Sequence, residues 1–319
     1  MFLSICKNVF QNRLKWLIHK VKCIKEHGDK EENAYFCSII NSNDKKYGKK
    51  NLFVWLLLAG CYSLYAARVD TLMVESPSMK NSVKVVFILP DKALGDKALS
   101  CPVVYLLHGY GGNAKSWIEL KPELPAIADA KGWIFVCPDG KNSWYWDSPL
   151  HADFRYETFV SSELVDYTDG HYATKADRRF RAISGLSMGG HGALWLAIRH
   201  KGTFGAAGSM SGGVDIRPFP DNWNMKDPLG EYADNKEVWD NHTVMTQLDK
   251  IANGELALLI DCGEDDFFLN VNQELHKQLL QRKIDHDFIT RPGGHTSEYW
   301  NNSIDYHLLF FEKFFAKSK

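Results

Sequence analysis

RAISGLSMGGHGALWLAIRH, residues 181–200, is the stretch that decides the fold. Residues 181–186 form a short apolar run typical of a buried strand, and residues 192–200 carry apolar side chains at helical spacing. Between them the letters GLSMG match the pattern G-x-S-x-G, with Ser187 at its centre. A strand, a tight turn and a helix in this order form a nucleophile elbow, which presents a serine hydroxyl above a sheet. Ser187 is therefore the predicted nucleophile. The alternative is a tight turn whose serine takes no part in chemistry.

Strand-like and helix-like segments alternate on both sides of this elbow. Apolar runs predict strands at 83–89, 103–107, 133–137, 181–186, 204–210, 256–260 and 286–290. Apolar residues at helical spacing predict helices at 159–167, 192–200, 271–282 and 304–316. Continuous apolar runs are typical of strands buried on both faces. Their alternation with helices indicates an α/β fold, with a mostly parallel sheet and helices on both sides.

One long connection, residues 212–255, interrupts this alternation. It is rich in Asp, Asn, Pro and Trp. Connections of this length are usually functional or form a small substructure, so we expect a lid or a pocket wall. Trp223 and Trp239 would supply flat apolar contact surfaces. The alternative is that both indoles simply pack the insertion onto the core.

A serine hydroxyl needs a base, and the base needs an acid that orients it. His295 is the candidate base, because RPGGHTSEYW (291–300) is a glycine-rich loop between the last predicted strand and the last predicted helix. The stretch LLIDCGEDDFFLN (258–270) offers the acid. Asp266 is favoured because it lies three residues after a glycine, and Asp265 is its rival. The order Ser, Asp, His along the chain is the order expected with a nucleophile elbow.

Acyl transfer also needs two backbone N–H groups that hold the negatively charged oxygen of the intermediate. In an elbow, one of them belongs to the residue after the nucleophile, here Met188. The other comes from the loop after an earlier strand. LLHGYGGNAKSW (106–117) supplies such a loop, and Tyr110 is the candidate donor. His108 is expected to shape this loop, and His191 in the helix after the elbow is expected to be structural.

At these residues the sequence resembles the esterase D-like family of α/β hydrolases. The resemblance spans residues 83–315, and five motifs occur in order: LLHGYGG, PDGKNSWYWDS, GLSMGGHGAL, IDCGEDDFF and PGGHTSEYW. It implies an α/β-hydrolase fold. It also implies a catalytic triad of Ser187, Asp266 and His295, with Tyr110 and Met188 as the oxyanion donors.

The resemblance further suggests that residues 142–148 border the substrate pocket. Trp144, Tyr145 and Trp146 would then form a bulky acyl or aryl wall, with Trp223 of the insertion as a further substrate contact. The alternative for the three consecutive aromatic residues is simple packing of their loop.

The function that the resemblance implies is a serine carboxylesterase that hydrolyses short-chain acyl esters or carbohydrate esters, such as acetyl or feruloyl esters. We expect no metal ion and no organic cofactor. Two other activities stay open, namely acyl transfer to a sugar or lipid and thioester hydrolysis like that of S-formylglutathione hydrolase. A catalytically idle surface binding protein is the alternative outside the enzymes, and the complete set of serine, acid and histidine candidates speaks against it.

Charge is distributed unevenly along the 319 residues. Residues 1–50 balance at +6, residues 51–67 carry no charge and residues 68–319 balance at −7, which together give the formal net charge of −1. Binding of nucleic acid demands a basic face, so we expect no nucleic-acid partner for the main domain. Three of the seven cysteines, Cys101, Cys137 and Cys262, adjoin apolar runs and are expected to be buried free thiols.

The first 67 residues indicate targeting and are set apart from the esterase domain predicted at 68–319. KKNLFVWLLLAGCYSLYAA (49–67) has the lysines, the apolar run and the small residues of a secretory signal. Cleavage near Ala67 is one prediction. The letters LAGC (58–61) offer another, a lipoprotein held to a membrane through a lipid on Cys61, and an uncleaved anchor is the third. Export is expected, to the periplasm, the outer membrane or the medium. Residues 1–50 show no domain pattern, and a start codon assigned too far upstream would explain them.

Overall fold

Residues 67–317 are the part of the chain that the computed structural model describes. The predictions made for the extension 1–50 and for the signal 51–67 concern residues outside this part, except for Ala67, and they stay predictions. No helix among residues 67–317 combines the length and the apolar character needed to cross a membrane.

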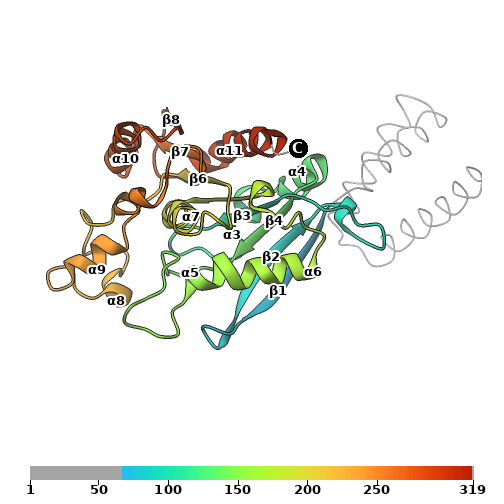
Figure 1. The fold of residues 1–319 in the computed structure, drawn as a ribbon, viewed down its shortest axis with the longest axis horizontal. Coiled ribbons are helices and arrows are strands. Elements are labelled where there is room, and N and C mark those ends of the chain that lie inside the picture. Colours follow the sequence, from blue (N-terminus) through green and yellow to red (C-terminus); the bar gives the residue numbers. More distant parts are fainter. Residues whose placement is uncertain (1–66, 318–319) are drawn as a thin grey trace, which may run out of the picture. The chain divides into compact units, whose positions relative to one another are not determined.

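Eight strands form one sheet in the order β1-β2-β4-β3-β5-β6-β7-β8 (Figure 1). The strands are β1 (Arg68–Ser76), β2 (Asn81–Leu89), β3 (Val103–Leu107), β4 (Ile134–Pro138), β5 (Arg181–Leu186), β6 (Ala206–Met210), β7 (Ala257–Gly263) and β8 (Asp287–Arg291). Strands β3 to β8 pair in parallel, whereas β2 pairs antiparallel with both β1 and β4. The predicted mostly parallel sheet is confirmed, and each predicted strand overlaps one of these strands.

The prediction misses β1. Its sequence, RVDTLMVES, alternates exposed and more buried side chains at the edge of the sheet. A strand at a sheet edge needs no continuous apolar run, because only one of its faces packs on the core. The antiparallel β1–β2 pair therefore does not show in the pattern that reveals the buried parallel strands.

Each predicted helix overlaps a helix of the structure, but the ends of the predicted helices differ from those observed. They are α3 (Ser116–Leu120), α4 (Leu124–Lys131), α5 (Tyr156–Thr158), α6 (Leu164–His171), α7 (Met188–Arg199), α8 (Lys226–Leu229), α9 (Lys236–Asn241), α10 (Leu269–Gln281) and α11 (Ser297–Lys317). The predicted helix 159–167 falls on the π-helical turn Phe159–Glu163 and the start of α6. The short helices α3 and α4 were not predicted, because segments of 5 and 8 residues are too short to show a helical period in the sequence.

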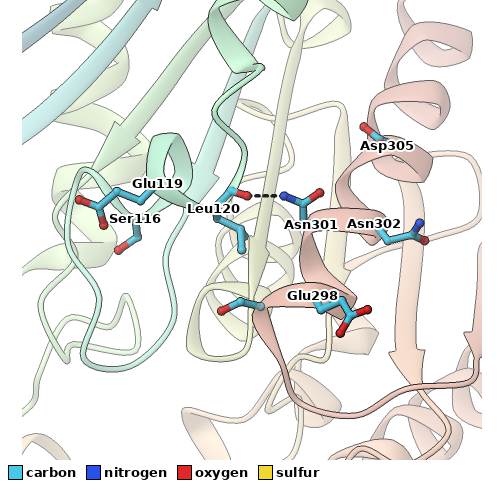
Figure 2. A pocket seen from close by; sticks show the side chains of 8 residues that line it. Ser116, Glu119, Leu120, Glu298, Asn301, Asn302 and Asp305 are labelled. Atoms are coloured by element: carbon cyan, nitrogen blue, oxygen red, sulfur yellow. Dashed lines mark hydrogen bonds between the residues drawn. The ribbon is translucent and has the colours of Figure 1, made fainter. Parts of the chain in front are cut away.

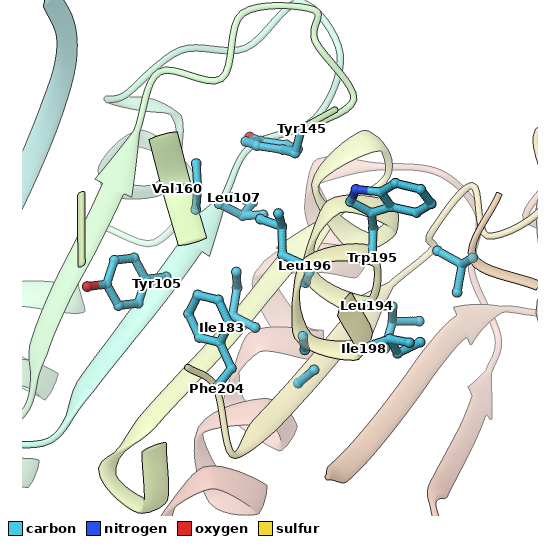
Figure 3. Packing of buried hydrophobic residues seen from close by; sticks show 14 of the residues in the cluster. Tyr105, Leu107, Tyr145, Val160, Ile183, Leu194, Trp195, Leu196, Ile198 and Phe204 are labelled. Carbon is cyan, nitrogen blue, oxygen red and sulfur yellow. The ribbon is translucent and has the colours of Figure 1, made fainter. Parts of the chain in front are cut away.

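Two apolar cores lie on opposite faces of the sheet, because successive strand residues point to opposite faces. Tyr105, Leu107 and Ile183 belong to one core, which side chains of α6, α7 and α10 complete; Figure 3 shows the part beside α7. Val104 and Leu106 belong to the other core, with side chains of α3, α4 and α11. Helices thus cover both faces, as predicted.

The insertion 212–255 connects β6 to β7 and contains the short helices α8 and α9. Trp239 is fully buried, and its Nε1–H donates to the Gly230 carbonyl at 2.9 Å. Trp239 therefore packs the insertion onto the core, which is the alternative considered for both tryptophans. The three cysteines of residues 67–317 are buried and free, which confirms the prediction for them.

Candidate active site

Four of the predicted site residues lie in loops that follow parallel strands. Tyr110 follows β3, Ser187 follows β5, Asp266 follows β7 and His295 follows β8. The carboxyl ends of parallel strands meet at one edge of a sheet, where open α/β folds bind their ligands. The strand order therefore gathers loops that lie far apart in the sequence.

Ser187 occupies a strained turn between β5 and α7. Its backbone has a φ of 54° and a ψ of −117°, a conformation that residues other than glycine rarely adopt. Two hydrogen bonds hold the turn. The Ser187 N–H donates to the Met210 carbonyl at 2.8 Å, and the Ser187 carbonyl accepts the His191 N–H at 3.0 Å. The strand, turn and helix predicted from the motif are all present.

The outer glycines of the motif let three backbone segments approach each other closely. An added Cβ at Gly185 would lie 2.2 Å from the Gly189 carbonyl oxygen, and an added Cβ at Gly189 would lie 2.2 Å from the Leu107 carbonyl oxygen. Both obstacles are backbone atoms, so no side-chain rotation relieves the overlap. The motif is therefore a packing requirement as well as a chemical one.

Gly189→Ala is expected to lower the free energy of unfolding by about 3 kcal/mol, because α7 or the end of β3 must shift to admit the methyl group. Urea unfolding followed by tryptophan fluorescence measures this change. The matched control is Gly170→Ala in α6, where an added Cβ meets no atom within 4 Å. That variant should gain roughly 0.5–1 kcal/mol, since alanine is the better helix former. Equal stabilities of the two variants would contradict the packing argument.

Ser187, His295 and Asp266 form a hydrogen-bonded row. His295 Nε2 lies 2.9 Å from Ser187 Oγ, and His295 Nδ1 lies 2.8 Å from Asp266 Oδ2 and 3.1 Å from its Oδ1. A proton on Nδ1 donates to the carboxylate, which leaves Nε2 free to accept the proton of the hydroxyl. The structure thus brings together the residues predicted as nucleophile, base and acid.

The adjacent residues Asp265 and Asp266 differ in how deeply they are buried and in the groups to which they form hydrogen bonds. Asp266 is only 5% exposed, and besides the imidazole its Oδ1 accepts the Phe268 N–H at 2.8 Å. Asp265 is exposed, and its backbone N–H donates to the Gly293 carbonyl at 2.9 Å. The favoured residue, Asp266, is the one that contacts His295.

Three aromatic rings surround the imidazole of His295, and those of Phe267 and Trp300 lie closer than that of Phe268, whose centroid is 5.5 Å away. The Phe267 ring lies 4.3 Å away between centroids at an interplanar angle of 37°, and the Trp300 ring lies 4.8 Å away at 87°. Sequence reasoning assigned neither residue a role. The available signal was position, since Phe267 adjoins Asp266 and Trp300 lies in the same motif as His295. Apolar rings at this place exclude water and strengthen the electrostatic contacts of the row.

His108 holds the glycine-rich loop that follows β3. Its Nδ1–H donates to the Gly109 carbonyl at 2.7 Å, and its Nε2 accepts the Gly140 N–H at 2.9 Å. The Gly111 N–H donates to Asn142 Oδ1 at 2.8 Å. The loop is thus fastened to the segment after β4, and His108 shapes it as expected.

The two predicted oxyanion donors have free N–H groups. Within residues 67–317 the backbone N–H of Tyr110 takes part in no hydrogen bond, and Tyr110 lines the same cleft as Ser187. Met188 is the first residue of α7, and the N–H groups of a first helical turn have no partner inside the helix. Both amides are therefore available to a ligand.

A cleft of about 320 Å³ lies over Ser187. It is lined by Gly109, Tyr110, Gly112, Ser116, Leu120, Leu186, Ser187, Trp223, Phe267, His295, Ser297 and Trp300. Trp223 comes from the insertion, so this segment supplies a wall of the cleft, as expected. A more open hollow of about 780 Å³ shares Ser116, Leu120 and Ser297 with the cleft and lies between α3 and α11 (Figure 2).

The expectation that Trp144, Tyr145 and Trp146 line the pocket is corrected. All three are at most 1% exposed and belong to the core, and none of them lines the cleft. Trp144 and Trp146 stack at 5.6 Å between centroids, and the Tyr145 hydroxyl donates to the His108 carbonyl at 3.0 Å. These apolar rings gain more from burial under the loop than from exposure in a cleft. The three aromatic residues therefore pack their loop onto the core, which is the alternative considered for them.

His191 is part of this packing. Its Nε2 accepts the Trp146 Nε1–H at 2.9 Å, and its Nδ1–H donates to the Gly213 carbonyl at 3.0 Å. Burial lowers the pKa of His191 to about 3, so the ring is neutral, as an acceptor at Nε2 must be. The structural role expected for His191 is confirmed.

The mostly parallel sheet, the nucleophile elbow at Ser187 and the hydrogen-bonded row of Ser187, His295 and Asp266 together define an α/β-hydrolase. The family model described as "Putative esterase" matches residues 76–311, and the chain therefore belongs to this family of carboxylic ester hydrolases.

Relatives and solved structures agree with this membership. An acetyl esterase of Caldicellulosiruptor saccharolyticus is 26% identical over 72% of this chain and 92% of its own length. A solved ferulic acid esterase has a TM-score of 0.66 and 28% identity, covering 78% of this chain and 99% of its own. In fold, the chain also resembles a fluorophosphonate-binding serine hydrolase of Staphylococcus aureus, with a TM-score of 0.70 at 21% identity, covering 77% of this chain and 99% of its own.

Proposed function

We propose that this chain is a serine carboxylesterase that works through a Ser187–His295–Asp266 triad and a covalent acyl-enzyme. The observation that carries the proposal is the hydrogen-bonded row, with 2.9 Å from Ser187 Oγ to His295 Nε2 and 2.8 Å from His295 Nδ1 to Asp266 Oδ2. This is the geometry in which an imidazole accepts the hydroxyl proton while a carboxylate fixes its tautomer.

The reaction runs in two steps. Ser187 Oγ bonds to the ester carbonyl carbon as its proton passes to His295 Nε2, and the carbonyl oxygen becomes an oxyanion. The N–H groups of Met188 and Tyr110 stabilise this oxyanion. The carbon–oxygen bond to the alcohol then breaks, and His295 gives its proton to the departing alcohol. In the second step a water molecule gives a proton to His295, attacks the acyl group and releases the acid, and Ser187 regains its proton.

The substrates we propose are short-chain acyl esters or carbohydrate esters, such as acetyl or feruloyl esters. The cleft of about 320 Å³ is at the small end of ligand pockets, which suits a small acyl group. Its aromatic lining, with Tyr110, Trp223 and Phe267, suits an apolar or aryl group. The names of the acetyl esterase and the ferulic acid esterase among the relatives support this choice.

A series of p-nitrophenyl esters from acetate to decanoate, with methyl ferulate and acetylated xylan beside it, tests the proposed substrates. We expect kcat/KM to be highest for the short chains. Trp223→Ala should raise the octanoate-to-acetate ratio of kcat/KM about tenfold, because removal of the indole lengthens the cleft, and pocket contacts of this kind discriminate by about 1–3 kcal/mol. Leu280→Ala, an exposed residue of α10 outside the cleft, is the control. An unchanged ratio in Trp223→Ala would count against this cleft as the acyl site.

A further inference from the structure

A buried carboxylate below the loop of His295 has no part in the proposed chemistry. Asp261 in β7 is 0% exposed. Its Oδ2 accepts Arg291 Nη2–H at 2.7 Å, and its Oδ1 accepts the Tyr299 hydroxyl at 2.5 Å and the Ser303 hydroxyl at 3.3 Å. A carboxylate at this depth is costly to bury unless such partners satisfy it. Asp261 and these three partners therefore form a hydrogen-bonded cluster that is part of the folded structure.

Two partners of Asp261, Arg291 and Tyr299, lie at the two ends of the loop that carries His295. Arg291 is the last residue of β8, and Tyr299 lies in the first turn of α11. Residues 292–296 form the loop between the end of β8 and the start of α11. One carboxylate on the neighbouring strand thus fastens the point where the loop begins and the point where it ends.

The loop also packs directly on this cluster. An added Cβ at Gly293 would lie 2.7 Å from Cδ2 of Tyr299, and an added Cβ at Gly263 would lie 2.2 Å from the Gly293 carbonyl oxygen. The Tyr299 ring and the end of β7 are therefore the support on which the loop rests. A displacement of the ring would displace the loop with it.

A second connection starts from the backbone of the same residue. The Asp261 carbonyl accepts the Ser211 N–H at 2.7 Å, and Ser211 Oγ accepts Trp300 Nε1–H at 3.2 Å. The Trp300 indole packs edge-on against the His295 imidazole. Asp261 is thus connected to the loop ends by its side chain and to a neighbour of the imidazole by its carbonyl.

We propose that Asp261 is a positioning residue that holds His295 at hydrogen-bonding distance from Ser187, an inference that rests on the proposed function. Asp261 touches neither the substrate nor a reacting atom, and it acts through Arg291 and Tyr299. Its importance follows from geometry, since a misplacement of about 1 Å in a catalytic group can lower the rate about 100-fold.

Tyr299→Phe tests the proposal with the least disturbance, because it removes one hydrogen bond to Asp261 and keeps the ring. We expect kcat for p-nitrophenyl acetate to fall about tenfold, with KM within about twofold of the wild-type value, since ground-state binding does not involve the base. Asp261→Asn breaks the pairing with Arg291 as well, and kcat should fall about 100-fold.

Tyr306→Phe is the matched control. Tyr306 lies in the same helix and its ring contacts the same guanidinium, 4.4 Å from Arg291 Cζ to the ring centroid, but it gives no hydrogen bond to Asp261. We expect its kcat to equal that of the wild type. If Asp261→Asn does not fold, Tyr299→Phe decides the question alone.

The NMR resonance of the His295 Nδ1 proton, which is hydrogen-bonded to Asp266, gives a readout independent of turnover. We expect Tyr299→Phe to shift or broaden it and Tyr306→Phe to leave it unchanged. Folded Tyr299→Phe with wild-type kcat and an unchanged resonance would overturn the positioning role. A wild-type chain without esterase activity would instead refute the proposed function, and the resonance would still report whether Asp261 positions the imidazole.

Discussion

Ser187→Ala is expected to lower kcat for p-nitrophenyl acetate by about 10⁶-fold. Loss of the nucleophile from a serine hydrolase removes the acyl-enzyme route entirely, and the small remaining rate comes from substrate binding and the oxyanion donors. The structure predicts little change in stability, because among residues 67–317 the Ser187 hydroxyl forms a hydrogen bond with His295 alone. Initial-rate assays and covalent labelling by a fluorophosphonate measure the two consequences.

The control for this prediction is a second serine in the same cleft. Ser297 lines the cleft and is exposed, so Ser297→Ala changes the same functional group at the same place. It should keep activity within a few-fold of the wild type and should still be labelled. Labelling of Ser187→Ala, or retention of more than about 1% of the wild-type kcat, would show that another residue is the nucleophile.

Asp266→Asn should also have a large effect, a fall in kcat of about 10⁴-fold. The side-chain amide of asparagine would donate to His295 Nδ1, which puts the ring proton on Nε2, where the base must accept the proton of Ser187. The hydrogen bond from the Phe268 N–H survives, because asparagine keeps an acceptor oxygen. The loss should therefore appear in kcat while the folded structure is retained.

Asp265→Asn is the control that the chain itself offers. Asp265 adjoins Asp266 but is exposed, and its described hydrogen bond uses the backbone. Near-wild-type kcat in this variant, beside the large loss in Asp266→Asn, would establish which carboxylate orients the imidazole. Equal losses in both variants, or a larger loss in Asp265→Asn, would contradict the assignment.

Much of the fold follows from local pattern. Strands buried on both faces, such as Val103–Leu107 and Arg181–Leu186, show as continuous apolar runs, so their positions and the parallel sheet were predictable. The edge strand β1 was not, because its apolar residues alternate with polar ones, and the helices α3 and α4 were not, because they are too short to show a helical period. The strand order was also beyond prediction, since it depends on contacts between segments distant in the chain.

Part of the active site was likewise predictable from local sequence, and part was not. Ser187 and His295 were identified from motifs whose glycines are needed for close backbone approach. The pocket wall expected from Trp144, Tyr145 and Trp146 was wrong, because nothing in a run of aromatic residues shows whether it faces a cleft or the core. Phe267 and Trp300 were overlooked for the same reason, since their places beside Asp266 and in the motif of His295 do not show which way their rings face.

The amino-acid sequence by itself determined the elbow, the chemical types of the reacting groups and their order along the chain, because these depend on residues adjacent in the sequence. The tertiary structure decided which aspartate meets the imidazole, which aromatic rings enclose it and which buried carboxylate secures its loop. Such choices depend on where strands β5, β7 and β8 lie beside one another, and that arrangement exists only once the sheet has formed.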